Sequence, residues 1–190
     1  MLTTPKQFPS SGRELLDGSP FRTYSYSYPH KTAYRPLIPA VPLREVWKSE
    51  CRDSLFLYLH VPFCEFRCGF CNLFALSQPD TTLADLYLEA VGRQADVVGD
   101  CLGNATFSRL AIGGGTPTFL SLHELRRVFE ILRSRFGIRS NSIPASVEAS
   151  PHTISSEKLC LLREYGVSRL SLGVQSFDDR WIEPGTRSQT

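Results

Sequence analysis

Three cysteines, Cys64, Cys68 and Cys71, stand within the eight residues CEFRCGFC. Thiolates spaced this closely can hold a metal centre on one short loop. Gly69 gives the backbone the conformational freedom to fold around that centre. Iron-sulfur clusters are usually held by four cysteine thiolates, so three leave one iron open. An open iron can chelate a substrate or cofactor, much as catalytic zinc keeps one position free. The spacing therefore predicts a chemically active metal centre.

Two other interpretations of these cysteines stay open on spacing alone. Zinc ligands also commonly sit two to four residues apart, and His60 or Cys51 could supply a fourth ligand. Cysteines can also be buried simply as small hydrophobic side chains. That interpretation is the weaker one, because Arg67 between the first two cysteines favours the thiolates that metal binding requires. Outside the motif, Cys101 and Cys160 have no matched partner and are expected to be structural.

A glycine run and two polar residues are further candidates for binding. Gly113 to Gly115 would let backbone amides approach a ligand closely, and Thr116 adds a hydroxyl. A glycine-rich turn after a strand is often only a turn, so this run alone is a weak signal. Glu148 can accept hydrogen bonds but is equally typical of an exposed strand end, and Gln175 can both donate and accept.

Strand and helix patterns alternate from Leu55 onward and place these candidates together. Short runs of bulky apolar residues predict four strands, over residues 55–61, 108–115, 143–149 and 168–176. Strands that alternate with helices imply right-handed crossovers and a parallel sheet, either open or curved into part of a β/α barrel. Ligands gather at the carboxyl ends of such strands, where the cysteines, the glycines and both polar residues fall.

Three helices are predicted between the strands. The first is expected to begin at Thr82 with a capping box, and the second at Ser121 with Glu124 as its partner. The third, Ser155 to Tyr165, is expected to turn Leu159 and Leu162 inward. The fold class that follows is α/β with a parallel sheet. The family resemblance described below implies a partial barrel, truncated after about four strands.

The composition narrows the classes of partner. With 190 residues and 42% hydrophobic content, the chain can form one ordinary core but not two large ones. Its 21 basic and 19 acidic residues are spread along the sequence, which indicates no nucleic acid and no acidic membrane surface. Small-molecule partners are expected instead. Residues 1–10 contain no apolar run typical of a signal peptide or anchor, which favours a cytoplasmic location.

The expected domain organisation has three parts. Residues 1–50 are rich in proline and tyrosine without a sustained period, which indicates an extended arm. Residues 51–178 would form the core, and residues 179–190 an atypical tail without a helical pattern. A full β/α barrel takes at least about 200 residues, so a truncated or frameshifted product that is inactive is one expectation for this chain.

Four motifs resemble one known family in the right order. The segment 57–71, LYLHVPFCEFRCGFC, resembles the signature of radical S-adenosylmethionine enzymes, in particular the branch of oxygen-independent coproporphyrinogen III oxidase. GGGTPTFL (113–120), SVEAS (146–150) and RLSLGVQSF (169–177) match the same branch, so the resemblance covers about residues 50–178.

The resemblance implies that the three cysteines of the motif hold a four-iron, four-sulfur cluster. An electron from the reduced cluster would cleave S-adenosylmethionine to a 5'-deoxyadenosyl radical, with a flavodoxin- or ferredoxin-type protein as electron donor. The resemblance also implies that Glu148 and Gln175 face S-adenosylmethionine and that the glycines bind its methionine end. The cofactor-binding positions implied in this way are Tyr58, Phe70, Gly114, Gly115, Thr116, Glu148 and Gln175.

One departure from the family pattern bears on the substrate. Decarboxylating coproporphyrinogen oxidases typically carry another cysteine two places beyond the third ligand, where this chain has Leu73. The segment CNLF (71–74) is more similar to relatives associated with haem utilisation, methyl transfer or natural-product tailoring. The alternatives are therefore a radical enzyme acting on a tetrapyrrole-like or other organic substrate, a haem or tetrapyrrole chaperone of the same fold without turnover, and a zinc-stabilised binding domain.

Overall fold

The structure is a computed structural model that describes residues 35–68, 71, 73–174 and 176–178. The chain divides into two units, Met1–Val41 and Pro42–Thr190, and the elements below belong to the second. Phe70 and Gln175, both predicted to bind cofactor, lie outside the described residues. The predicted division at residues 50 and 178 stays a prediction.

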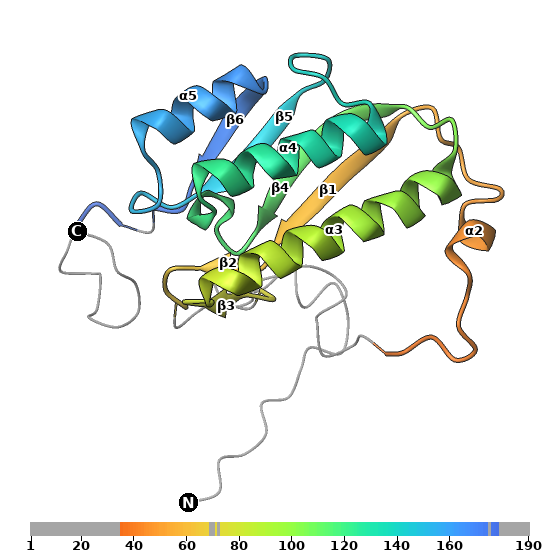
Figure 1. Cartoon of the computed structure of the whole chain (residues 1–190), viewed down its shortest axis with the longest axis horizontal. Helices are drawn as coiled ribbons and strands as arrows, with labels where there is room; N and C mark the ends of the chain where they lie inside the picture. The colour runs from red at the N-terminus through yellow and green to blue at the C-terminus, as the bar shows by residue number, and fades with distance from the viewer. Residues whose placement is uncertain (1–34, 69–70, 72, 175, 179–190) are drawn as a thin grey trace, which may run out of the picture. The chain divides into compact units, whose positions relative to one another are not determined.

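Four parallel strands form the main sheet, in the order β1-β4-β5-β6 (Figure 1). Their bounds are β1 (Leu55–Val61), β4 (Phe107–Gly114), β5 (Ala145–Ala149) and β6 (Val167–Leu172). The register brings Val61 level with Gly114, and Glu148 level with Ser171. The predicted α/β fold with a partial barrel of four strands is confirmed, although β6 ends at Leu172 rather than at residue 176.

Three long helices lie on one side of this sheet: α3 (Thr81–Leu102), α4 (Leu122–Phe136) and α5 (Ser156–Glu164) (Figure 1). A fourth, α2 (Leu43–Val46), precedes β1. Strand side chains that alternate toward the helices form the core with them, and each buried leucine or isoleucine contributes about 1.5–3 kcal/mol. These buried residues include Leu59, Val61, Ile112, Val147, Leu125, Val128 and Leu132. No helix among the described residues is long and apolar enough to cross a membrane.

The starts of two helices test the sequence predictions directly. Ser121 and Glu124 form the predicted capping box of α4, each side chain accepting from the other's backbone N–H. The predicted start at Thr82 is wrong, because the carboxylate of Asp80 caps α3 by accepting from the Thr82 N–H at 3.1 Å. Aspartate is a strong N-cap, and this one lies two positions earlier.

The prediction for the inward face of α5 is confirmed for Leu162, which is buried, and wrong for Leu159, which is 46% exposed. Leu161 is buried in its place. The inward face is set by Tyr165, just beyond the helix, whose ring stacks on Phe129 of α4 with centroids 4.5 Å apart. Leu161 precedes this tyrosine by four residues and Leu162 by three, so both share its side of the helix.

Two strands of two residues each were not predicted, and they frame the cysteine loop. β2 (Phe63–Cys64) pairs in parallel with β3 (Leu76–Ser77). The Leu76 N–H donates to the Pro62 carbonyl at 2.6 Å, and the Gln78 N–H donates to the Cys64 carbonyl at 2.9 Å. These bonds close the loop between residues 64 and 76. After β4, the short 3₁₀ helix η2 (Pro117–Phe119) leads to α4.

A Gly166→Ala variant is expected to be strongly destabilised. Gly166 has φ of 78°, and a Cβ there would lie 2.2 Å from the backbone nitrogen of Asn141. Overpacking and the left-handed backbone together are expected to lower the free energy of unfolding by about 2–4 kcal/mol. Urea unfolding measures this loss.

Gly137→Ala is the matched control for that variant. Gly137, the C-cap of α4, has a similar φ of 67°, but no atom lies within 4 Å of a Cβ placed there. Its replacement is expected to cost only the conformational term of about 1 kcal/mol. Equal losses in the two variants would contradict the close approach of Gly166 to Asn141.

Candidate functional site

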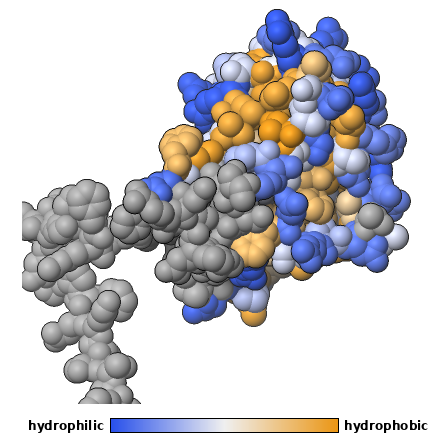
Figure 2. All heavy atoms as spheres, turned by 90° about the vertical axis from the view of Figure 1, so that its left-hand side faces the viewer, coloured by the Kyte–Doolittle hydropathy of each residue, from blue (hydrophilic) through white to orange (hydrophobic). Residues whose placement is uncertain are grey.

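A cavity of about 280 Å³ opens at the carboxyl ends of the strands. Figure 2 views the molecule from the left-hand side of Figure 1 and shows apolar surface bordered by hydrophilic residues. The cavity brings together all three motif cysteines and four other predicted site residues. They are Cys64, Cys68, Cys71, Gly114, Gly115, Thr116 and Glu148.

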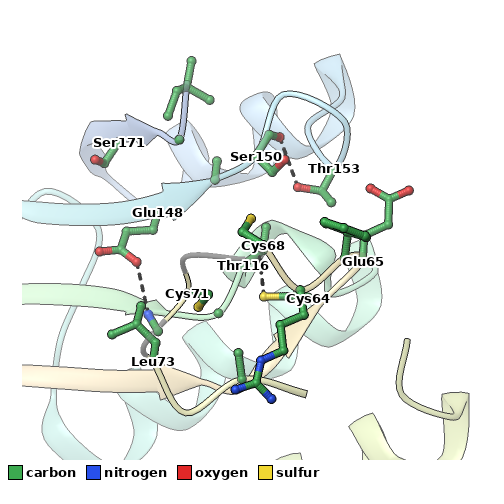
Figure 3. Close-up of a pocket in the computed structure, with 18 residues that line it drawn as sticks. Cys64, Glu65, Cys68, Cys71, Leu73, Thr116, Glu148, Ser150, Thr153 and Ser171 are labelled. Atoms are coloured by element: carbon green, nitrogen blue, oxygen red, sulfur yellow. Dashed lines mark hydrogen bonds between the residues drawn. The ribbon is translucent and has the colours of Figure 1, made fainter. Parts of the chain in front are cut away.

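The three cysteines enter the cavity from β2 and the loop that follows it (Figure 3). Cys64 ends β2 and is buried, and the Thr116 hydroxyl donates to its Sγ at 3.6 Å. Cys68 and Cys71 are partly buried and lie on one turn, in which the Cys71 N–H donates to the Cys68 carbonyl at 2.9 Å. None of the three forms a disulfide bond among the described residues. All three thiols line the same cavity.

The packing around Cys64 depends on a glycine. A Cβ at Gly115 would lie 2.5 Å from the Phe63 carbonyl oxygen and 2.9 Å from the Cys64 Sγ. The glycine run therefore lies directly against the strand that carries the first cysteine. The Gly115 N–H donates to the Val61 carbonyl at 2.7 Å, and the Thr116 N–H to the Phe63 carbonyl at 2.7 Å. The sequence suggested that these glycines either approach a ligand or form a simple turn, and the structure adds that Gly115 packs against a cysteine.

The fourth ligands considered for zinc are poorly placed. Cys51 precedes β1 at its amino end, about 20 Å along the strand from the cavity. Both ring nitrogens of His60 are within hydrogen-bond distance of other groups, Nδ1 of the Tyr58 hydroxyl at 3.1 Å and Nε2 of the Phe74 carbonyl at 2.8 Å. Within the described part of the chain, no three His, Cys, Asp or Glu side chains gather as ligands of a single ion. The donor set of three cysteines suits a cluster better.

His60 holds the end of the cysteine loop against β1. A carbonyl oxygen only accepts, so Nε2 donates to Phe74, and the neutral ring then accepts from Tyr58 at Nδ1. A Cβ at Gly114 would lie 2.6 Å from this ring, which shows how closely the glycine run packs on it. The sequence suggested that His60 is either a structural residue or a fourth ligand of a zinc site. Its position two residues after Tyr58 on one strand face was the available signal.

A His60→Phe variant is expected to release iron about fivefold faster to a chelator. It removes one hydrogen bond to the loop, worth about 1 kcal/mol. Tyr58→Phe is the matched control, because it removes the hydroxyl and leaves the contact with Phe74 in place. Absorbance measures the rate of iron release. Equal rates in the two variants would contradict this role of His60.

Glu148 carries negative charge to the same edge of the sheet. Its Oε2 accepts from the Gly114 N–H at 3.1 Å, as the dashed line in Figure 3 shows. Gly113 faces the same carboxylate, and a Cβ there would lie 3.0 Å from it. The carboxylate thus rests on the glycine run with its other oxygen available to a ligand. A negative group here suits the positively charged parts of a cofactor.

Two tyrosines that contact His60 stay protonated at neutral pH. Burial, followed by the charge of Glu148, raises the pKa of Tyr58 above its ordinary value. Burial, followed by Tyr58, raises the pKa of Tyr87 to about 12. The hydroxyl of Tyr87 donates to the His60 carbonyl. Tyr58 lines a neighbouring groove rather than the cysteine cavity, so its predicted contact with cofactor stays a prediction.

Three polar residues of the cavity wall were missed from the sequence. Ser150 and Thr153 follow β5, and the Thr153 hydroxyl donates to the Ser150 carbonyl at 3.1 Å. Ser171 stands level with Glu148 on β6. For Ser150 and Thr153 the available signal is position, because both follow the carboxyl end of the predicted strand 143–149. Ser171 lay in the middle of the predicted strand 168–176 and had no such signal.

Cysteines, glycines and a carboxylate at the carboxyl ends of a parallel sheet define a protein that binds a metal cluster together with an organic cofactor. The sequence profile of the Radical SAM superfamily matches residues 58–190, and the chain belongs to that family. Members of the family use a four-iron, four-sulfur cluster and S-adenosylmethionine, so the predicted cofactors are confirmed.

Named relatives fall into two groups. The chain is 38% identical to "Heme chaperone HemW" of Bacillus subtilis over 129 residues, which cover 66% of this chain and 33% of that protein. It is 35% identical to "Oxygen-independent coproporphyrinogen III oxidase" of Escherichia coli K12 over 164 residues, which cover 82% of this chain and 35% of that enzyme.

The solved structure of coproporphyrinogen III oxidase (HemN) from Escherichia coli, described as a Radical SAM enzyme, superposes with a TM-score of 0.69. The two are 31% identical, and the match covers 78% of this chain and 34% of that one. The chain thus spans about a third of the length of these relatives.

Proposed function

We propose that this chain provides the cluster-binding and S-adenosylmethionine-binding part of an oxidoreductase acting on a tetrapyrrole. The observation that carries the proposal is the packing of Gly115 against Cys64 in a cavity that also holds Cys68 and Cys71. When bound, the reduced cluster supplies the electron that cleaves S-adenosylmethionine to methionine and a 5'-deoxyadenosyl radical. A flavodoxin- or ferredoxin-type protein would supply that electron.

The residues of the cavity have separate roles in this proposal. Cys64, Cys68 and Cys71 bind the cluster and leave one iron open for the cofactor. Glu148 offers its free carboxylate oxygen to the ammonium or ribose of S-adenosylmethionine, and its charge favours the sulfonium. Gly114 holds that carboxylate in place. The neighbouring walls position the cofactor, and the cofactor performs the difficult chemical step.

A tetrapyrrole substrate is supported by both groups of relatives. One group is named for oxidising coproporphyrinogen III and the other for acting as a heme chaperone. Both names describe proteins that handle a tetrapyrrole ring. The proposed substrate is therefore a small organic molecule of that class.

A second candidate is a haem chaperone that keeps the cluster fold without substrate turnover. It is favoured by Leu73, which stands where decarboxylating oxidases of the family typically carry a further cysteine. Leu73 lines the cavity and is exposed to it. The 38% identity to the heme chaperone of Bacillus subtilis agrees with this candidate.

Anaerobic reconstitution with iron and sulfide, followed by dithionite and S-adenosylmethionine, tests the proposal. We expect 5'-deoxyadenosine by mass spectrometry, together with loss of added coproporphyrinogen III. Tight haem binding without 5'-deoxyadenosine would favour the chaperone. Protein that takes up zinc but no iron would contradict both. Cys160→Ala, an exposed cysteine on α5, is the matched control for variants of the motif cysteines.

A further inference from the structure

The face of the sheet opposite α3, α4 and α5 carries a row of large side chains, here called the open face. It is formed by Phe56, Tyr58, Arg109, Ser146 and Arg169, one or two from each strand. Phe56 stands level with Arg109, and Ser146 with Arg169. Phe56 is 61% exposed and Tyr58 50% exposed. Aromatic rings this open on the inner side of a partial barrel form a ready contact surface for an apolar ring system.

The open face is hollowed into a groove of about 440 Å³ that is separate from the cysteine cavity. Phe56, Arg109, Ser146, Ser168 and Arg169 line it. Ser146 precedes Glu148 by two residues on β5, and Arg169 precedes Ser171 by two on β6. Two residues of strand span about 7 Å, so the groove lies one side-chain layer below the cofactor cavity. A ligand in the groove would lie next to the cofactor.

The groove holds two positive charges without a counter-charge of its own. Among the ion pairs and side-chain hydrogen bonds of the described residues, none involves the guanidinium of Arg109 or Arg169. The hydroxyls beside them donate to backbone carbonyls, Ser146 to Leu110 and Ser168 to Ala145. Within the four strands, the acid on this face is Glu148, which already accepts from Gly114.

Arginine presents a planar fork that pairs with a carboxylate through two parallel hydrogen bonds. Arg109 on β4 and Arg169 on β6 lie on either side of β5. Ala111, rather than Arg109, stands level with Ser146 and Arg169. Two strand spacings and this offset of two residues separate the two arginine positions by about 12 Å. That separation suits two carboxylates on one ligand better than a single small anion. The aromatic rings and the two arginines of the open face together fit a ligand with an apolar ring system and carboxylates on its edge.

We propose that Arg109 and Arg169 bind carboxylates of the substrate on the open face while Phe56 and Tyr58 contact its ring. The inference rests on the proposed function, because it takes the substrate to be a tetrapyrrole. It adds residues that determine specificity, and a second binding surface beneath the cofactor cavity.

Fluorescence titration of the full chain with coproporphyrin, a tetracarboxylate, tests the inference. Arg109→Gln and Arg169→Gln are each expected to weaken binding about ten- to hundredfold, because each removes a charge-assisted pair. Binding of coproporphyrin tetramethyl ester, which has the same ring without the charges, is expected to be unchanged by either variant. Arg163→Gln is the matched control, an exposed arginine on α5 without an ion pair among the described residues.

Three outcomes would overturn the inference. They are unchanged coproporphyrin binding in both variants, equal weakening in Arg163→Gln, and displacement of coproporphyrin by an equal concentration of inorganic phosphate. Arg169→Lys, which keeps the charge and loses the fork, is expected to recover part of the affinity if folding is intact. Formation of 5'-deoxyadenosine without substrate is measured in parallel. Its absence from the parent chain would count against the proposed function, whereas the porphyrin titrations judge the arginines alone.

Discussion

A Gly115→Ala variant is expected to lose most of its cluster although every cysteine remains. The added methyl group would meet the Phe63 carbonyl oxygen at 2.5 Å and the Cys64 Sγ at 2.9 Å. The carbonyl cannot move away without cost, because it accepts the Thr116 N–H at 2.7 Å. Relief of the clash must push β2 and Cys64 away from the glycine run. Overpacking of about 1–3 kcal/mol corresponds to a roughly 5- to 150-fold loss of iron affinity.

Gly92→Ala is the control for this variant. Gly92 lies within α3, and no atom lies within 4 Å of a Cβ placed there. The change should stabilise the helix by up to about 1 kcal/mol and leave iron content unchanged. Iron and sulfide analysis after anaerobic reconstitution compares the two variants. Full iron content in Gly115→Ala would show that the glycine does not position Cys64.

The second large effect is expected from Glu148→Gln. Glutamine keeps the shape and can still accept the Gly114 N–H, but it lacks the negative charge beside the cofactor. A hydrogen bond to a charged group contributes about 1.5–3 kcal/mol, so the affinity for S-adenosylmethionine should fall about ten- to hundredfold. The cluster should be retained, because Glu148 is not among its proposed ligands.

Equilibrium dialysis of labelled S-adenosylmethionine measures that affinity, with visible absorption to report the cluster. Glu130→Gln, an exposed acid on α4 away from the cavity, should leave both quantities unchanged. An unaltered dissociation constant in Glu148→Gln would show that this carboxylate only holds the glycine run and does not bind S-adenosylmethionine. Joint loss of cluster and cofactor would point to misfolding of the loop.

The features of the fold that follow from local sequence were predictable. β1 has the predicted bounds, and the capping box of Ser121 and Glu124 forms as expected, because both depend on residues close in the chain. The inward face of α5 depends instead on Tyr165 stacking against Phe129, a partner from another helix. The strands β2 and β3 are too short to leave a periodic pattern, since two residues define no alternation.

The candidate site was predictable in its residues but not in its contacts. Position at strand ends was enough to select Cys64, Gly115 and Glu148. The register of the strands decides which neighbour each one meets, and register is a property of the folded sheet. For that reason the packing of Gly115 on Cys64, and the contact of His60 with Phe74, were visible only in the structure.

Electron paramagnetic resonance of the reduced, reconstituted chain tests the central claim most directly. If Cys64, Cys68 and Cys71 hold a four-iron, four-sulfur cluster with one open iron, the reduced protein gives the signal of that cluster. Addition of S-adenosylmethionine then changes the signal. Alanine at any of the three cysteines abolishes it, while Cys160→Ala preserves it. A signal that does not respond to S-adenosylmethionine, or protein that binds zinc in place of iron, would contradict the account.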